Sequence, residues 1–222
     1  NAKRVLDTSC GWGDRLAGFF TSDAEEYIGC DPNPNTYKQY LKQVETYNSF
    51  LSKPKKVTIY NCGAEDLPWD KIDNIDCAFT SPPYFSTERY NEGGEKEENQ
   101  SWFKFDEYSK WRDDFYLPVS KKTFNSLSPT GHMFINIMDP KVKNHRHKSC
   151  DELVASLKEH FMGQIGMRIM QRPKSDKLFE TEKDKQEFMN KTFIENVWYF
   201  SKDKNFDLFS TARKGTLDSF FS

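Results

Sequence analysis

Short apolar segments alternate with helix-like segments along the first half of the chain, and this alternation constrains the fold most. Strand-like runs cover residues 4–7, 26–30, 57–60 and 75–80, and helix-like runs cover residues 14–20 and 35–51. Such alternation favours parallel strands joined by right-handed crossovers. We therefore expect an α/β protein with a doubly wound, mostly parallel sheet that binds its ligands beyond the carboxyl ends of the strands.

The second half of the chain continues this pattern and then departs from it. Residues 106–127 and 151–161 have helical spacing, and residues 131–138 form a buried strand-like run. Residues 164–171 and 193–200 are typical of two strands, separated by a charged segment at 174–190. We expect this pair to add a terminal antiparallel strand to the sheet. Residues 85–105 are polar and rich in Gly and Glu, which predicts a long loop.

The composition excludes several classes of protein. No apolar run reaches the roughly 18 residues of a membrane span, and the start lacks the apolar stretch of a secretory signal. The five cysteines form no Cys-x-x-Cys pair, so we expect reduced thiols and no metal site. These features predict an intracellular protein of the cytoplasm or nucleus that has no membrane partner.

Charge limits how the chain could bind a nucleic acid. The formal net charge is −2, so contacts with phosphates must come from local basic patches. The densest patch contains Lys141, Lys143, Arg146 and Lys148. We predict that this patch and the loop 85–105 border a nucleic-acid groove, although a solvated loop is the simpler interpretation of the patch alone.

A glycine-rich turn between two acidic residues predicts a nucleotide-like cofactor. Asp7 closes the first strand, Gly11 and Gly13 form a turn that lets the backbone approach a ligand, and Asp31 closes the second strand. An acid in the position of Asp31 can accept hydrogen bonds from ribose hydroxyls. A dinucleotide is the competing ligand, but the third glycine of the dinucleotide motif is replaced by Leu16.

This arrangement resembles the class I S-adenosylmethionine-dependent methyltransferases, which implies a seven-stranded Rossmann-like sheet. By this resemblance Asp7 would orient the methionine ammonium group, Gly11 and Gly13 would face it, and Asp31 would bind the ribose. A third motif at residues 61–68 would cradle the adenine, but many relatives carry Asp where this chain has Gly63. Adenine recognition would then depend on the backbone or on Glu65. The resulting cofactor set is Asp7, Thr8, Cys10, Gly11, Trp12, Gly13, Asp31, Pro32, Ala64 and Glu65.

The strongest single motif follows the strand at 75–80 and consists of Ser81, Pro82, Pro83 and Tyr84. It resembles the Asp/Asn/Ser-Pro-Pro-Tyr/Phe motif of enzymes that methylate exocyclic amines of adenine or cytosine. An exocyclic amine has its lone pair delocalised into the ring, so a catalyst should accept its hydrogens while the nitrogen attacks the methyl group. Ser81 and the Pro82 carbonyl can be these acceptors. Tyr84, together with Phe85, would stack on a base extruded from its helix.

The two motifs together predict an S-adenosylmethionine-dependent methyltransferase of DNA bases, similar to small enzymes of phages and large DNA viruses. Serine at the head of the motif slightly favours N4 of cytosine over N6 of adenine. Two alternatives remain: a methyltransferase of RNA bases, and an inactive cofactor-binding scaffold that acts through its C-terminal tail. The segment that usually precedes the first strand in such enzymes is absent, so we expect further residues upstream.

The end of the sequence predicts a separate binding element. We assign residues 1–202 to the catalytic domain and residues 203–222 to a polar tail. Leu217, Phe220 and Phe221 resemble the Gln-x-x-Leu-x-x-Phe-Phe peptide that docks in a sliding clamp. Lys214 replaces the usual Gln, which should weaken such binding. The alternative is that these apolar side chains pack on the domain's own core or in a dimer.

Overall fold

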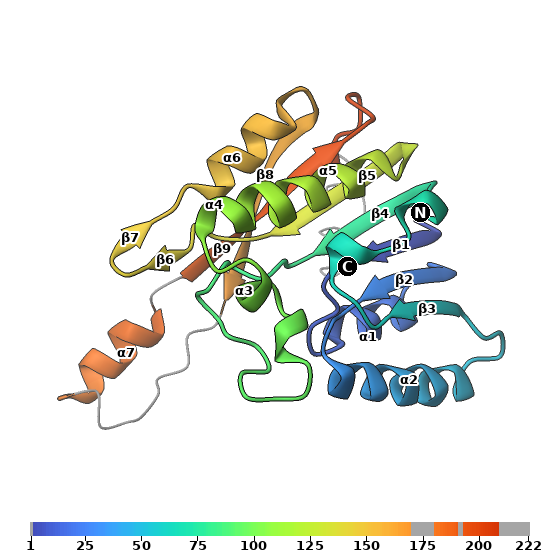
Figure 1. Cartoon of the computed structure of the whole chain (residues 1–222), viewed down its shortest axis with the longest axis horizontal. Coiled ribbons are helices and arrows are strands. Elements are labelled where there is room, and N and C mark those ends of the chain that lie inside the picture. Colours follow the sequence, from blue (N-terminus) through green and yellow to red (C-terminus); the bar gives the residue numbers. More distant parts are fainter. Residues whose placement is uncertain (1, 170–179, 191–192, 209–222) are drawn as a thin grey trace, which may run out of the picture.

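A seven-stranded sheet forms the centre of the molecule in the computed structural model, which describes residues 2–169, 180–190 and 193–208 (Figure 1). The strand order is β3-β2-β1-β4-β5-β9-β8. The strands are β1 (Arg4–Asp7), β2 (Glu26–Cys30), β3 (Lys56–Tyr60), β4 (Ile75–Thr80), β5 (Leu127–Asn136), β8 (Phe161–Ile169) and β9 (Phe193–Ser201).

β9 runs in the opposite direction to the other six strands of this sheet. The pairs from β3 through β5 are all parallel, whereas β9 is antiparallel to both β5 and β8. The predicted doubly wound, mostly parallel sheet with one terminal antiparallel strand is therefore confirmed. The strand order reverses between β1 and β4, so their carboxyl ends border the crevice in which such sheets bind ligands.

Helices lie against both halves of the sheet (Figure 1). A cluster around Leu16, Phe19 and Tyr40 packs the first two helices onto β1–β3, and a larger cluster around Leu6, Met133 and Leu153 fills the rest of the core. The helices are α1 (Asp14–Thr21), α2 (Pro34–Ser49), α3 (Ser101–Lys104), α4 (Tyr108–Lys110), α5 (Leu117–Asn125), α6 (Ser149–Ser156) and α7 (Glu182–Asn190).

Several segments differ in detail from the sequence-based expectation. The expected helix at 106–127 consists of α4, a π-helical segment Trp111–Tyr116 and α5, because the larger turn lets three aromatic side chains of that segment enter the core. The expected helix at 151–161 begins and ends earlier as α6 and continues as a short 3-10 turn, Lys158–His160. The charged segment at 174–190 contains α7, and the loop 85–105 contains α3.

A small two-stranded hairpin lies outside the main sheet. It consists of β6 (Lys141–Val142) and β7 (His145–Arg146), and it follows the carboxyl end of β5. His147 anchors it, because its ring stacks on Tyr108 with centroids 3.8 Å apart. None of the helices in the described segments is long and apolar enough to cross a membrane.

Two tryptophans provide a matched test of this packing. Trp111 is 0% exposed and stacks on Tyr116 with ring centroids 4.6 Å apart, whereas Trp12 is 82% exposed. We expect Trp111→Ala to lower the free energy of unfolding by about 3–5 kcal/mol because it leaves a cavity. The control, Trp12→Ala, should change it by no more than about 0.5 kcal/mol. Urea unfolding followed by circular dichroism measures both, and equal losses would contradict the assigned core.

Candidate functional site

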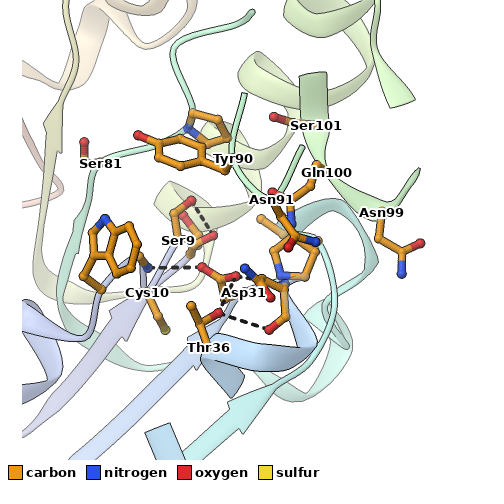
Figure 2. A pocket seen from close by; sticks show the side chains of 18 of the residues that line it. Ser9, Cys10, Asp31, Thr36, Ser81, Tyr90, Asn91, Asn99, Gln100 and Ser101 are labelled. Atoms are coloured by element: carbon orange, nitrogen blue, oxygen red, sulfur yellow. Dashed lines mark hydrogen bonds between the residues drawn. The ribbon is translucent and has the colours of Figure 1, made fainter. Parts of the chain in front are cut away.

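A cavity of about 300 Å³ opens at the carboxyl ends of the parallel strands (Figure 2). Loops that follow β1, β2, β3 and β4 all contribute to its wall, as does the segment 90–101. A buried hydrogen bond of 3.2 Å between the Thr8 and Thr80 hydroxyls joins the ends of β1 and β4 beneath it. The principal lining residues are Thr8, Ser9, Cys10, Gly11, Trp12, Arg15, Asp31, Pro32, Gly63, Ala64, Glu65, Ser81, Pro83, Tyr90, Asn91, Gln100 and Ser101.

The glycine-rich turn after β1 forms one wall of this cavity. Gly11 and Gly13 have φ angles of +59° and +84°, in the left-handed region that favours glycine. The Gly13 amide donates to the Cys10 carbonyl at 3.1 Å, and the Tyr40 phenol donates to the Gly11 carbonyl. Gly11 lines the cavity, whereas Gly13 lies outside it against Gln43.

Asp31 presents a carboxylate at the cavity wall. It accepts hydrogen bonds from the Gly11 amide at 3.1 Å, the Asn33 amide at 2.9 Å and the Thr36 hydroxyl at 3.3 Å. Burial raises the pKa of Asp31 above its usual value, although these hydrogen bonds act in the opposite direction. A partly desolvated carboxylate of this kind can accept hydrogen bonds from the hydroxyl groups of a ligand.

Asp7 lies beneath the turn and does not line the cavity. Its carboxylate is fully buried and accepts hydrogen bonds from Arg15 Nε at 2.7 Å, the Tyr27 hydroxyl at 2.8 Å and the Ser9 amide at 3.1 Å. Arg15, which the sequence analysis did not single out, lines the cavity in its place. The structure therefore does not bring the Asp7 carboxylate into contact with a ligand in this cavity.

The turn after β3 supplies another part of the wall. Ala64 and Glu65 belong to a short 3-10 turn, Ala64–Asp66. Glu65 Oε1 accepts a hydrogen bond from Lys104 Nζ at 2.7 Å, which links this turn to α3. Burial tends to lower the pKa of Lys104, but its hydrogen bonds with Glu65 and Asp66 outweigh burial and raise it.

Ser81 and Pro83 of the Ser-Pro-Pro-Tyr motif line the cavity directly. Pro82 lines a separate small pocket that shares Thr8 and Ala64 with this cavity. The cofactor-type turn and the reaction motif are thus brought to one site, although they lie far apart in the sequence.

The side chain of Tyr84 does not line the cavity and points toward β9. Its hydroxyl lies 2.5 Å from Glu195 Oε1 on β9 and 3.2 Å from the Asn136 carbonyl. Burial, followed by the hydrogen bond with Glu195, raises the pKa of Tyr84. The sequence analysis missed Glu195, because nothing in the sequence relates it to a residue 111 positions earlier.

Phe85, predicted to lie at the nucleic-acid surface, is a core residue. It is 5% exposed and has a φ angle of +52°. Its ring contacts Tyr108, Trp111 and His147, with centroids 5.7 to 6.0 Å apart. The positive φ angle of Phe85 accompanies a side chain that points into the core. Phe85 therefore packs beneath the Ser-Pro-Pro-Tyr motif.

The segment after the motif closes over the cavity, which the sequence did not reveal. It was predicted to be a loop beside a nucleic-acid groove, yet Tyr90, Asn91 and Gln100 line the cavity (Figure 2). The only signal in the sequence is the cluster of polar residues directly before the apolar α3. Other lining residues that the sequence analysis did not single out are Ser9, Asp14, Asn33, Thr36, Asn99, Ser101 and Phe115.

The basic patch lies on and beside the hairpin β6–β7, outside this cavity. Lys141, Lys143, Arg146 and Lys148 are all exposed. Lys148 lies 3.6 Å from Asp151, and both side chains are largely exposed. His147 holds the hairpin next to Phe85, so the patch borders the segment that follows the reaction motif.

Comparison with known protein families identifies one relationship. A family model described as DNA methylase matches residues 75–218, which is more than half of the chain. The match includes the Ser-Pro-Pro-Tyr motif and begins after the glycine-rich turn. No curated protein matches the sequence.

Solved structures share the fold at low sequence identity. A protein from Thermoplasma acidophilum assigned as a methyltransferase has 9% identity and a TM-score of 0.53, and the alignment covers 92% of this chain and 70% of that one. A protein from Listeria monocytogenes assigned as S-adenosylmethionine-dependent has 13% identity and a TM-score of 0.52, with 91% of each chain covered. One from Streptococcus mutans, solved with SAH, has 15% identity and a TM-score of 0.51, with 90% and 88% covered.

The family match and the cavity agree on one chemistry. The chain is an S-adenosylmethionine-dependent methyltransferase, and it acts on an exocyclic amino group of a base in DNA. The fold described above is the one that the neighbouring methyltransferase structures share. The chain therefore belongs to the DNA methylase family of N6- and N4-amino methyltransferases.

Proposed function

We propose that the cavity binds S-adenosylmethionine and that Ser81 and Pro82 hold the exocyclic N4 amine of a cytosine extruded from DNA. The observation that carries the proposal is the meeting of two walls in one cavity. Gly11 and Asp31 stand on one side, and Ser81 and Pro83 on the other. A donor of methyl groups bound against the first wall would present its reactive end to an acceptor held by the second.

The first wall fits a nucleoside with an amino-acid side arm. Asp31 offers a partly buried acceptor for ribose hydroxyls, and the left-handed backbone at Gly11 leaves room that a side chain would fill. Pro32 and Ala64 offer apolar contact for an adenine ring, while Thr8, Cys10 and Trp12 extend along the side arm. Asp7 and Gly13 act indirectly, because they shape the turn. When bound, S-adenosylmethionine supplies an electrophilic methyl group.

The second wall fits an amine that must become more tetrahedral as it reacts. Ser81 Oγ and the Pro82 carbonyl accept the two amine hydrogens and so direct the nitrogen lone pair toward the cofactor side of the cavity. The two consecutive prolines fix the backbone, so these acceptors need little reorganisation during the reaction. The role of the motif is positioning and electrostatic stabilisation.

Tyr84 acts as a rigid wall for the extruded base in this proposal. Glu195 and the Asn136 carbonyl hold its hydroxyl, which fixes the plane of the ring. A ring held in this way loses little conformational freedom when a base stacks on it. Phe85 supports this wall from the core and does not itself touch the base.

The identity of the target base is tested by analysis of the product. Purified protein is incubated with labelled S-adenosylmethionine and with DNA and RNA of the same sequence, and the digested nucleosides are identified. We expect N4-methylcytosine in DNA, since serine heads the motif. Methyladenine as the only product would contradict the cytosine assignment, labelled RNA alone would contradict the DNA assignment, and bound cofactor without transfer would favour a scaffold.

Substitutions in the first wall should weaken cofactor binding, whereas substitutions in the second wall should slow methyl transfer. We expect Asp31→Ala to weaken binding of S-adenosylhomocysteine at least tenfold, because the ribose loses a charged acceptor. Ser81→Ala should leave that affinity unchanged and lower kcat by about 10²–10³-fold, as loss of one preorganised polar contact does. Calorimetric titration and single-turnover methylation measure the two effects.

The exposed Asp23 provides the control for Asp31, and Asp23→Ala should bind like the wild type. Unchanged affinity in Asp31→Ala would contradict the placement of the ribose. Reduced cofactor affinity in Ser81→Ala would contradict the separation of the two walls.

The hairpin patch provides a test of where DNA binds. We expect simultaneous replacement of Lys141, Lys143, Arg146 and Lys148 by Gln to weaken DNA binding and to reduce the slope of log K against log salt by up to about 3.6, or roughly 0.9 for each lost phosphate contact. Binding of S-adenosylhomocysteine should not change. Fluorescence anisotropy at several salt concentrations measures the slope, and an unchanged slope would place the DNA elsewhere.

The tail segment with Leu217, Phe220 and Phe221 lies outside the described residues. We propose, from the sequence alone, that it docks in a sliding clamp and so couples methylation to newly replicated DNA. We expect a peptide of residues 210–222 to bind a eukaryotic or archaeal clamp, and Phe220→Ala with Phe221→Ala to abolish that binding. A peptide that does not bind, combined with a loss of domain stability in the double variant, would favour packing onto the domain.

A further inference from the structure

Two buried polar atoms in the cavity wall have opposite hydrogen-bonding character and lack partners within the described residues. Glu65 Oε2 is an acceptor, and Gln100 Nε2 is a donor. Both residues line the cavity, and Gln100 is only 6% exposed. A buried polar atom without a partner costs free energy, so a ligand that pairs with both atoms gains binding free energy from them.

Lys104 links the turn that carries Glu65 to the segment that carries Gln100. Its ammonium group lies 2.7 Å from Glu65 Oε1, and its backbone amide donates to the Gln100 carbonyl at 3.0 Å. The side chain of Glu65 also occupies the space above Gly63, where an added Cβ would lie 2.4 Å from a carboxylate oxygen. A side chain at position 63 would therefore require the Glu65 carboxylate to move.

We propose that Gln100 and Glu65 together recognise the edge of the cofactor's adenine. Adenine presents an amino group beside an acceptor nitrogen of the ring. Glu65 Oε2 accepts from the amino group, and Gln100 Nε2 donates to the neighbouring ring nitrogen. Gln100 comes from the segment after the reaction motif, so this segment recognises the cofactor as well as covering it. The inference depends on the proposed binding of S-adenosylmethionine in this cavity.

The experiment compares two ligands that differ only at this edge. S-adenosylhomocysteine carries adenine, whereas S-inosylhomocysteine has oxygen in place of the amino group and a hydrogen on the adjacent ring nitrogen. We expect the wild-type chain to prefer the adenine ligand at least tenfold in calorimetric titrations, because the other ligand leaves buried groups unpaired.

Gln100→Leu tests the glutamine directly, since leucine has a similar size and no hydrogen-bonding group. We expect this variant to bind S-adenosylhomocysteine about tenfold more weakly and to keep a smaller preference for it, because Glu65 still accepts from the amino group. Its melting temperature without ligand should not fall, because the substitution removes an unpaired buried amide. Gln186→Leu, at an exposed position of α7, is the matched control and should behave like the wild type.

The outcomes separate this inference from the proposed function. Gln100→Leu with unchanged affinity and preference would overturn the inference and leave the cofactor site standing. An equal loss of affinity for both ligands would also overturn it, because cavity shape would then explain the effect. A wild-type chain that binds neither ligand would overturn the proposed function together with the inference.

Discussion

The buried carboxylate of Asp7 organises the site. Its hydrogen bonds with Arg15, Tyr27 and the Ser9 amide fix the end of β1, the start of α1 and the neighbouring strand β2 at one point. A buried charge of this kind is tolerated only when it is paired and hydrogen-bonded. The shape of the glycine-rich turn, and with it one wall of the cavity, therefore depends on a group that the cavity does not expose.

The remaining walls depend on the sheet. Parallel strands end at one edge, and the reversal of strand order between β1 and β4 leaves that edge open. The bond between Thr8 and Thr80 then fixes the separation of the two motifs at their base. The chemistry needs this arrangement, because a methyl donor and its acceptor must be held on a common line.

The sequence predicted the parts of this architecture that local signals encode. The strands up to residue 80 were found as short apolar runs, and the positions of Asp31 and Ser81 followed from the ends of two of these runs. Asp7 and Phe85 show the limit of such reasoning. Asp7 was expected to face the ligand, but partners 8 and 20 residues away hold it inside.

Long-range contacts account for the other differences. The segment 85–105 looked like an open loop because its contacts with the cavity join residues far apart in the sequence, such as Lys104 and Glu65. The interrupted helix at 106–127 has a similar cause, since the π-helical turn becomes favourable only when Trp111 and Tyr116 have a core to enter. Neither contact leaves a periodic trace in the sequence.

The position of β9 has a consequence for the order in which the protein can assemble. β9 lies between β5 and β8, although it is the last of these strands to be synthesised. Within the described part of the chain, β8 therefore has no strand to pair with until β9 has left the ribosome. The hydrogen bond between the Tyr84 hydroxyl and Glu195 likewise cannot form until Glu195 has been synthesised. A nascent chain can form the glycine-rich turn before β9 has been synthesised, but the tyrosine of its reaction motif is held in place only after residue 195 has been synthesised.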